Sequence, residues 1–389
     1  MVGTTMMDRG VCDLVESIEF EDTDGMADQL KIIIKNPDYV ISDNRIFMVG
    51  SEVSVFMGYG GDHKHVGRAR IYKVAPIFEQ DVMPSIEITG WTRDHEMMHN
   101  SPPQATSRGR SGGKRIGGKR VQSQDGRIFK NVKYSEAVEQ RAKSYNFKTD
   151  VDVSPDSPSD FVQAVGMSDY DFIQGMANIT GYVFWVDGTP KGEWTLHFKD
   201  PEKLKEQDMT FKFEYNMNNA STLFRFEPEF LVSESVAQIR ARTLNTDKGE
   251  VVEVEFSEDS VAGTPELEIT NPYDVASEII RGSPEQALSV QLYIGDYTFY
   301  EVANRRFKSE AELRVWAKQW FRRNKENFIT ARADTIGVAN IRSRQVHEIA
   351  GVGKVYSGKY YFSRVAHRCS NDASGYMLDF SCRKQTPKD

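Results

Sequence analysis

Residues 67–74 read GRARIYKV, and residues 358–365 read GKYYFSRV. Each segment has a glycine, a basic residue, two further residues, a large apolar residue, one more residue, a basic residue and a valine. A Gly-x-Gly turn precedes each of them. This internal echo predicts two similar β-barrels in one chain.

The first of these β-regions is marked by short runs in which apolar and polar residues alternate, with Gly, Asp, Asn and Pro between the runs. Such runs are typical of strands in a small antiparallel barrel or sandwich. The runs are VESIEF (15–20), LKIIIK (30–35), EVSVFM (52–57), RARIYKV (68–74) and SIEITGW (85–91). We expect a first β-barrel domain over residues 10–100.

Residues 101–127 are rich in glycine and basic residues and contain Pro102 and Pro103. This composition cannot bury a core, so we expect a loop that stays solvated or orders against an acidic partner or nucleic acid during assembly. A nucleotide-binding loop is not expected, because Arg120 stands where such a loop needs Ser or Thr. The candidate assembly residues are Arg108, Arg110, Lys114, Arg115, Lys119 and Arg120.

Residues 128–206 change to a helical period and predict a small α+β domain. Val138, Ala142 and Tyr145 share one face of a first helix, and a second short helix is expected around 161–165. A third helix begins at the capping residue Ser168 and ends at Gly181, before a hairpin.

Residues 207–389 return to strand patterns and predict a second β-barrel domain, interrupted by a helix over 309–328. Ser309 and Glu312 have the spacing of a capping box, and the apolar residues that follow fall on one stripe. The stripe consists of Leu313, Trp316, Ala317 and Trp320. The fold class is therefore α+β and mainly β: two similar small antiparallel β-barrels, an intervening α+β domain and one long helix.

Composition limits the function. The 389-residue chain has a net charge of −8, which argues against broad nucleic-acid binding. No apolar run is long enough for a membrane span, and the first residues lack the pattern of a secretory signal. Three cysteines without CxxC spacing predict buried or incidental thiols. We expect no cofactor.

One motif fits the HExxH pattern of zinc hydrolases, with His95 and His99 as ligands and Glu96 as the base. Pro102 lies three residues beyond the motif, which leaves room for little more than one helical turn. Residues 62–65, DHKH, form a second possible ligand group at an expected hairpin tip, where polar residues are usually solvated. We therefore expect no metal and no enzyme, and keep a zinc-dependent hydrolase using the HEMMH segment as the alternative of a different class.

Three segments carry a family resemblance: the helix that leads into a hairpin over 168–182, the closing strands over 357–383, and the basic SRGR segment at 107–110 before the first helix. Together they resemble the bacteriophage tail-hub family, meaning the late control gene D proteins of contractile-tailed phages and the hub part of type VI secretion spikes. The structural residues of this signature are Phe172, Gly181, Tyr182, Gly358, Tyr360, Val365, His367 and Phe380.

The resemblance implies a structural subunit that forms a homotrimer. Three chains with two similar barrels each would give a pseudo-sixfold ring that joins a threefold spike to a sixfold tail tube. Strand edges would pair or abut between neighbours. The implied partners are a separate spike or needle protein and tail-tube and baseplate proteins, with possible transient passage of DNA. The protein would assemble in the host cytoplasm and then reside in the virion tail baseplate; the alternative is the hub of a non-viral injection or type VI-like machine.

Overall fold

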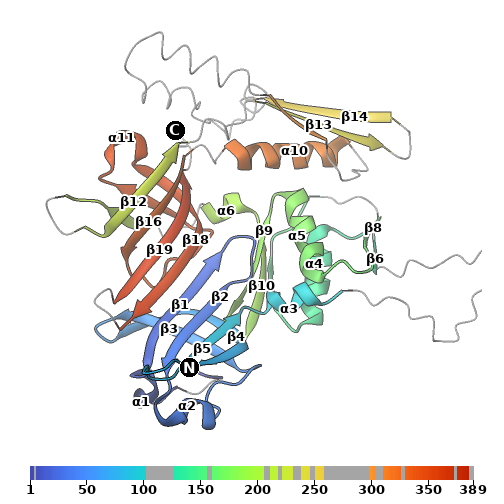
Figure 1. Ribbon diagram of the computed structural model, residues 1–389. Coiled ribbons are helices and arrows are strands. Elements are labelled where there is room, and N and C mark those ends of the chain that lie inside the picture. Colours follow the sequence, from blue (N-terminus) through green and yellow to red (C-terminus); the bar gives the residue numbers. More distant parts are fainter. Residues whose placement is uncertain are drawn as a thin grey trace, which may run out of the picture.

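A large antiparallel sheet dominates the computed structural model, which places the two β-regions side by side (Figure 1). The model describes residues 1–3, 6–101, 127–155, 160–205, 211–217, 221–230, 238–245, 250–257, 298–302, 310–325, 329–371 and 375–384. Within these ranges the sheet has 11 strands. They are β1 (Val15–Thr23), β2 (Gln29–Lys35), β3 (Glu52–Tyr59), β4 (Asp62–Ile77), β5 (Ser85–Trp91), β11 (Lys212–Glu214), β12 (Leu223–Phe230), β16 (Ile329–Ile336), β17 (Val346–Ala350), β18 (Gly358–Ser370) and β19 (Tyr376–Lys384).

The strand order is β12-β16-β19-β18-β1-β2-β5-β4-β3, with β17 beside β18 and β11 beside β17. The first strand of the chain therefore pairs with a strand near its end. β1 and β18 run antiparallel, with Phe20 opposite His367 and Asp22 opposite Val365. The two β-regions expected from the sequence are thus joined into one continuous sheet.

The two segments of the sequence echo lie on strands with the same surroundings. β4 is paired with β3 before it and with β5 after it. β18 is likewise paired with β17 before it and with β19 after it. Each β-region therefore contains an antiparallel meander in which the echo occupies the middle strand.

Two apolar cores support the sheet. The N-terminal core includes Phe20, Leu30 and Ile88, and the C-terminal core includes Phe213, Phe362 and Phe380. Alternation in the strands explains this: in β2, for example, Leu30 and the isoleucines at every second position point inward while the lysines point outward. Short helices flank these cores: α1 (Arg9–Cys12), the 3-10 helix η1 (Pro37–Tyr39), α2 (Val40–Asp43) and α11 (Gly353–Tyr356).

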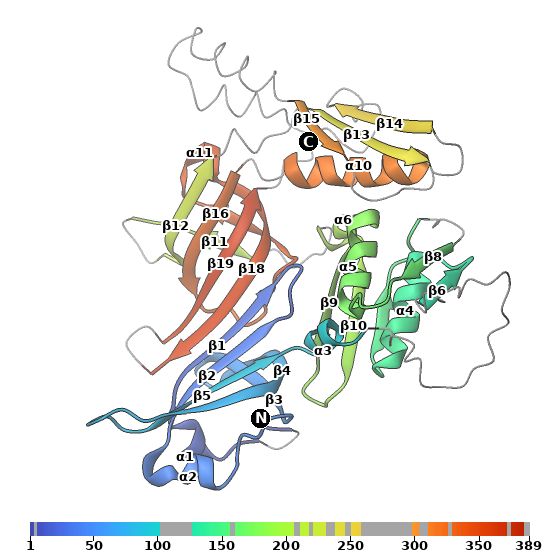
Figure 2. The same cartoon turned by 45° about the vertical axis from the view of Figure 1, so that its right-hand side comes forward.

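A third core holds a group of helices and short strands beside the sheet (Figure 2). Ser168 caps α5 by accepting a hydrogen bond from the Asp171 backbone, and Gly181 ends it in the left-handed conformation, as the sequence indicates. The expected second short helix is wrong: Phe161 and Val162 lie in the strand β8, because β8 pairs with β6. The elements are α3 (Asp94–His99), β6 (Arg127–Lys130), α4 (Tyr134–Ser144), β7 (Lys148–Val151), β8 (Asp160–Gln163), α5 (Asp169–Thr180), β9 (Val183–Gly188), β10 (Trp194–Lys199) and α6 (Pro201–Lys205).

A separate small layer lies above α5 in Figure 1. It consists of β13 (Gln238–Asn245), β14 (Glu250–Ser257), β15 (Thr298–Val302) and α10 (Glu310–Lys325). Leu313, Ala317 and Phe321 on α10 are buried against this three-stranded sheet, which confirms the helix and most of its apolar stripe. The described helices include none that is long and apolar enough to cross a membrane.

Gly67 gives a test of the N-terminal core. A methyl group there would lie 2.2 Å from the ring of Phe20, which is 2% exposed and cannot move aside easily. We expect Gly67→Ala to lower the free energy of unfolding by about 1–3 kcal/mol through overpacking, measured by urea denaturation. Gly10→Ala is the matched control, because nothing lies within 4 Å of its added methyl group; equal losses for both variants would contradict this packing.

Candidate functional site: a charged sheet face and a buried junction

One face of the large sheet carries a row of alternating charges. On β18, Arg364 bridges Glu21 of β1 at 2.7 Å and Asp379 of β19 at 2.6 Å. Arg368 repeats this arrangement, at 3.2 Å from Glu19 and 3.1 Å from Asp379. The row therefore crosses the seam between the two β-regions, and we call it the charge ladder.

The charge ladder continues in both directions. Toward the N-terminal strands, Glu87 of β5 pairs with Lys31 of β2 at 3.0 Å and with Lys73 of β4 at 2.8 Å. Toward the β12 edge of the sheet, residues of the charge ladder help to line a shallow depression of about 500 Å³. Its charged lining residues are Arg225, Glu227, Arg332, Asp334, Arg364 and Asp379. Partly exposed ion pairs each contribute only about 0–1 kcal/mol to folding, so the ladder acts mainly as a patterned surface.

Beneath the opposite face of β1 lies a buried junction formed by three aspartates and one arginine, Asp22, Asp28, Asp94 and Arg344. Arg344 is 5% exposed and forms an ion pair with Asp22, which is 2% exposed. Ser343 adds hydrogen bonds to the same carboxylate from its backbone nitrogen at 3.0 Å and its hydroxyl at 2.5 Å. Burial alone would raise the pKa of Asp22, but the Arg344 charge and these hydrogen bonds hold it below its usual value.

The other two carboxyl groups lack an equivalent partner. Thr92 links the two residues: its hydroxyl accepts from the Asp28 backbone nitrogen at 2.9 Å and donates to the carboxyl group of Asp94, at Oδ1, at 2.6 Å. Burial raises the pKa of Asp94 to about 6. Burial, and then the charge of Asp22, raises the pKa of Asp28 well above its usual value. The buried junction thus contains one arginine for three aspartates. Ionising all three carboxyl groups at once is therefore unfavourable.

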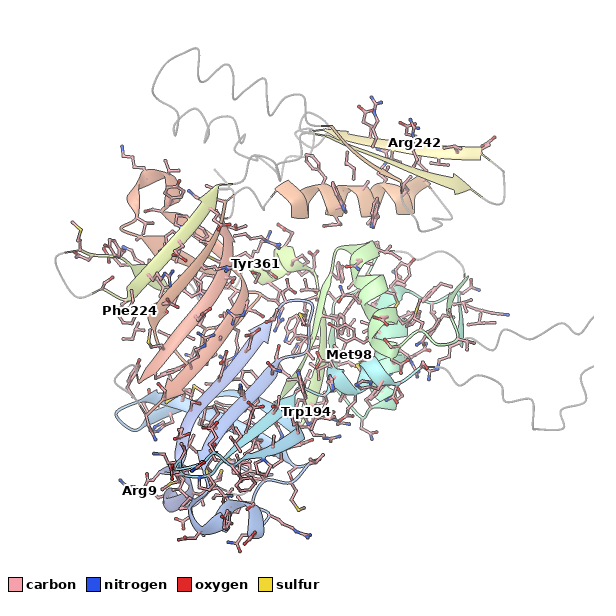
Figure 3. The ribbon with its side chains drawn as sticks, in the orientation of Figure 1. Arg9, Met98, Trp194, Phe224, Arg242 and Tyr361 are labelled. Carbon is pink, nitrogen blue, oxygen red and sulfur yellow. The ribbon has the colours of Figure 1, made fainter. Side chains whose placement is uncertain are left out.

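The buried junction connects three parts of the fold. The Arg344 guanidinium lies over the ring of Trp185 on β9, 4.7 Å from its centre. Tyr361 of β18 donates to Asp24 at 3.0 Å, and Tyr170 of α5 donates to the Gly25 carbonyl at 2.6 Å. The turn after β1 is therefore held from both sides. Tyr361 is labelled in Figure 3.

A second contact fixes the N-terminal strands to the hairpin of β9 and β10. Arg68, which is 3% exposed, forms an ion pair with Glu52 at 2.7 Å and donates to the Pro190 carbonyl at 3.3 Å. Trp194, labelled in Figure 3, donates its indole hydrogen to Glu52 at 3.1 Å. The first basic residue of the sequence echo thus has a structural role in β4.

The eight signature residues fall into two groups that do not meet. Phe172 and Tyr182 belong to the core around α5, and Gly181 ends that helix with a φ of 77°. The second group lies on β18 and β19 and consists of Gly358, Tyr360, Val365, His367 and Phe380. These residues maintain packing and define no common pocket.

His367 is a buried structural histidine. Its Nε2 lies 2.9 Å from the Ile341 carbonyl, which requires a hydrogen on that nitrogen. Nδ1 then accepts the Tyr376 hydroxyl at 2.8 Å. Burial lowers the pKa of His367 to about 3, so the ring is neutral and satisfied, as its place in an apolar strand suggests.

The HEMMH segment does form a helix, but α3 has only six residues. Its Glu96 carboxylate pairs with Arg70 and, at 3.1 Å, with Arg93. A carboxylate held by two arginines is poorly suited to take a proton from a metal-bound water, as a hydrolase requires. The assembly residues between Arg108 and Arg120 lie outside the described residues, so their role stays a prediction.

The sequence carried one signal for the buried junction. In β1, Asp22 follows Ile18 and Phe20 at every second position, so a carboxylate falls on the inward-facing phase of the strand. Nothing comparable marks Arg344, which lies in a loop. Glu19 and Glu21 occupy the outward-facing positions of β1, so the sequence indicates these two carboxylates of the charge ladder. It does not indicate their arginine partners on β18.

The fold as a whole is similar to that of solved tail proteins. Similar solved structures include a tail protein from Neisseria meningitidis (TM-score 0.63, 10% identity, covering 95% of this chain and 92% of that one). They also include the 43 kDa tail protein of prophage MuSo2 from Shewanella oneidensis (TM-score 0.64, 8% identity, 95% and 94% covered). A component of the Escherichia coli type VI secretion system, c3393, matches with a TM-score of 0.55 at 8% identity, with 96% and 74% covered.

At these identities the likeness shows the fold, and it confirms the mainly β, hub-like architecture that the sequence resemblance implies. The family model of the Alg8 N-terminal domain matches residues 119–371, well over half of the chain, and the protein belongs to that family. No curated protein matches the sequence.

The ion pair of the buried junction can be tested by removing one partner. Arg344→Gln should lower the free energy of unfolding by about 3–5 kcal/mol, because it leaves the Asp22 carboxylate buried and unpaired. Adding Asp22→Asn should recover part of this loss. Urea denaturation measures both, with Arg225→Gln, on an exposed pair, as the matched control; a control variant as unstable as Arg344→Gln would contradict the assignment.

The pH dependence of Asp94 has a defined sign. Because the folded state raises its pKa from the usual 3.8 to about 6, this group stabilises fully below about pH 4 and the contribution is lost as pH rises through 6. A rise of the pKa from 3.8 to about 6 corresponds to about 3 kcal/mol. We expect Asp94→Asn to gain stability relative to the natural protein by up to that amount between pH 4 and pH 7.

The measurement is urea denaturation of both proteins at each pH, so that contributions from groups outside the buried junction cancel in the difference. Asp62→Asn, at an exposed carboxylate, is the control for the substitution itself. A difference for Asp94→Asn that does not change with pH would contradict a raised pKa for this carboxyl group.

Proposed function

We propose that the chain is a structural hub subunit of a phage-type contractile tail. Three copies form a pseudo-sixfold ring that joins a separate spike protein to the tail tube and baseplate, and the subunit has no catalytic role. The observation that supports this most strongly is the hub-like fold, which extends over 95% of the chain in its likeness to two tail proteins. The protein would act in the tail of the assembled particle.

The pseudo-sixfold symmetry is supported by the two meanders. Each chain has one meander in β3-β4-β5 and another in β17-β18-β19, both within the same sheet. Three such chains therefore present six similar strand groups to a ring. The charge ladder crosses both groups, so six copies of a related pattern would face a sixfold partner and match its charges.

The contact between neighbouring copies is assigned to β12. This strand is one end of the sheet, and among the described strands it pairs with β16 alone. It exposes 53% of Phe224, which is labelled at the sheet edge in Figure 3. The other end is partly covered, because Val2 bridges Val53 and Gly3 donates to the Glu52 carbonyl at 2.6 Å. An open edge with an apolar side chain is suited to abut another chain.

The basic segment 108–120 supplies a second contact in this proposal, ordering against acidic surfaces of a partner on assembly. Transient passage of DNA through the ring is part of this proposal, and the net charge of −8 disfavours its retention. The same fold occurs in a type VI component, so the proposal extends to a non-viral injection machine of the same architecture.

The oligomeric state tests the ring. Light scattering coupled to size exclusion should give about three times 44.2 kDa at all concentrations tested. Phe224→Glu should shift the mass to that of a monomer while circular dichroism stays unchanged, because a buried charge at the β12 edge opposes the contact. Val251→Glu, at an exposed apolar residue on β14, is the control and should remain trimeric. A natural protein that stays monomeric even when co-expressed with its spike would contradict the ring.

A further inference from the structure

The side chains of the two histidines of α3, His95 and His99, face each other through their Nε2 atoms. Their Nε2 atoms lie 3.4 Å apart. This is longer than an ordinary hydrogen bond between nitrogen and its acceptor, which spans about 2.7–3.2 Å. Two imidazole nitrogens bound to one tetrahedral zinc ion at about 2.0–2.1 Å stand about 3.3–3.4 Å apart. The distance between the Nε2 atoms of His95 and His99 therefore matches the spacing of two nitrogen ligands bound to the same zinc ion.

Contacts with two aromatic side chains hold the His95 ring in the orientation that faces His99. It stacks on Trp91, with ring centres 4.7 Å apart and planes within 15°, and meets the edge of Tyr72 at 4.8 Å. A preoriented ligand reduces the entropy lost on binding.

The helix itself is anchored from both sides. Met97 is fully buried in the core around α5, and the Asn100 carbonyl accepts a hydrogen bond from the Asp169 backbone at 2.7 Å. Asp94 at its start is buried in the junction. The short helix is therefore fixed by its neighbours and does not depend on its own length for stability.

The charged groups around the two histidines are engaged in ion pairs. Arg70 and Arg93 both pair with Glu96, and Arg70 also pairs with Glu52, which Arg68 shares. The described residues contain no group of three metal-ligating side chains, so the protein supplies two ligands here. His99 is exposed, which leaves the remaining coordination positions open to solvent or to a side chain of a neighbouring protein.

We propose that His95 and His99 form a surface binding site for one divalent transition-metal ion, held by the two Nε2 atoms and completed by water. The site binds and does not catalyse, because Glu96 is engaged by the two arginines. Imidazole ligands favour zinc, nickel and copper ions, and copper(II) binds most tightly in this series. The proposal stands apart from the hub role and survives if that role is wrong.

Isothermal titration calorimetry of the full chain, purified without a histidine tag, tests the site with zinc chloride. We expect one zinc ion per chain and an affinity that falls about tenfold or more in His99→Gln. His99 is exposed, so this variant should fold normally. His63→Gln, at an exposed histidine on β4, is the matched control and should bind zinc as the natural protein does. Equal affinity in His99→Gln, or no binding with zinc in large excess, would overturn the proposal.

Copper(II) provides a second readout that locates the ion. Because His95 stacks on Trp91, a bound copper ion should quench the fluorescence of that tryptophan. Trp91→Phe should remove most of the quenching and retain copper binding by calorimetry. Quenching that persists in His99→Gln would place the copper elsewhere and contradict the assignment.

Discussion

The pairing of β1 with β18 is the constraint on which the rest of the structure depends. It joins strands more than 300 residues apart along the chain and turns two separate meanders into one sheet. The seam is secured on both faces. On one face Arg364 bridges Glu21 to Asp379, and on the other Asp22 holds Arg344. Because the charged groups on the inner face are buried, the arrangement tolerates little displacement, and the relative orientation of the two β-regions is fixed.

The same seam sets the position of the third part of the fold. Asp22, Asp24 and Gly25 lie at the end of β1 and in the turn that follows it, and this turn receives Arg344, Tyr361 and Tyr170 from three different elements. Buried contacts therefore couple the three parts of the fold through this turn. Such contacts are costly to break singly, which favours a rigid block.

Local features of the fold could be predicted from the sequence. Alternation located the strands of the N-terminal region, and Ser168 with Gly181 marked both ends of α5, because caps and periodicity depend on neighbouring residues. The merging of the sheets depends on contacts between distant segments that no local pattern records. β8 was mistaken for a helix because a four-residue strand is too short to establish its period.

For the candidate site the division was similar. Glu19 and Glu21 are visible as the outward phase of β1, and the HEMMH segment is visible as a motif, but what its residues do depends on Arg70 and Arg93. A sequence motif names residue types, whereas the ion pairs around Glu96 decide its chemistry. The resemblance of three segments indicated the hub-like fold, whereas the match to the Alg8 N-terminal domain family required comparison over residues 119–371.

Electron cryomicroscopy of the purified chain tests the central claim most directly, namely that three copies close into a ring whose six strand groups present the charge ladder on one common surface. The account predicts particles with threefold symmetry, an inner ring of six similar strand groups, and β12 of each chain beside its neighbour. Particles that are monomers or twofold dimers, or rings in which the charge ladder is buried between chains, would contradict it.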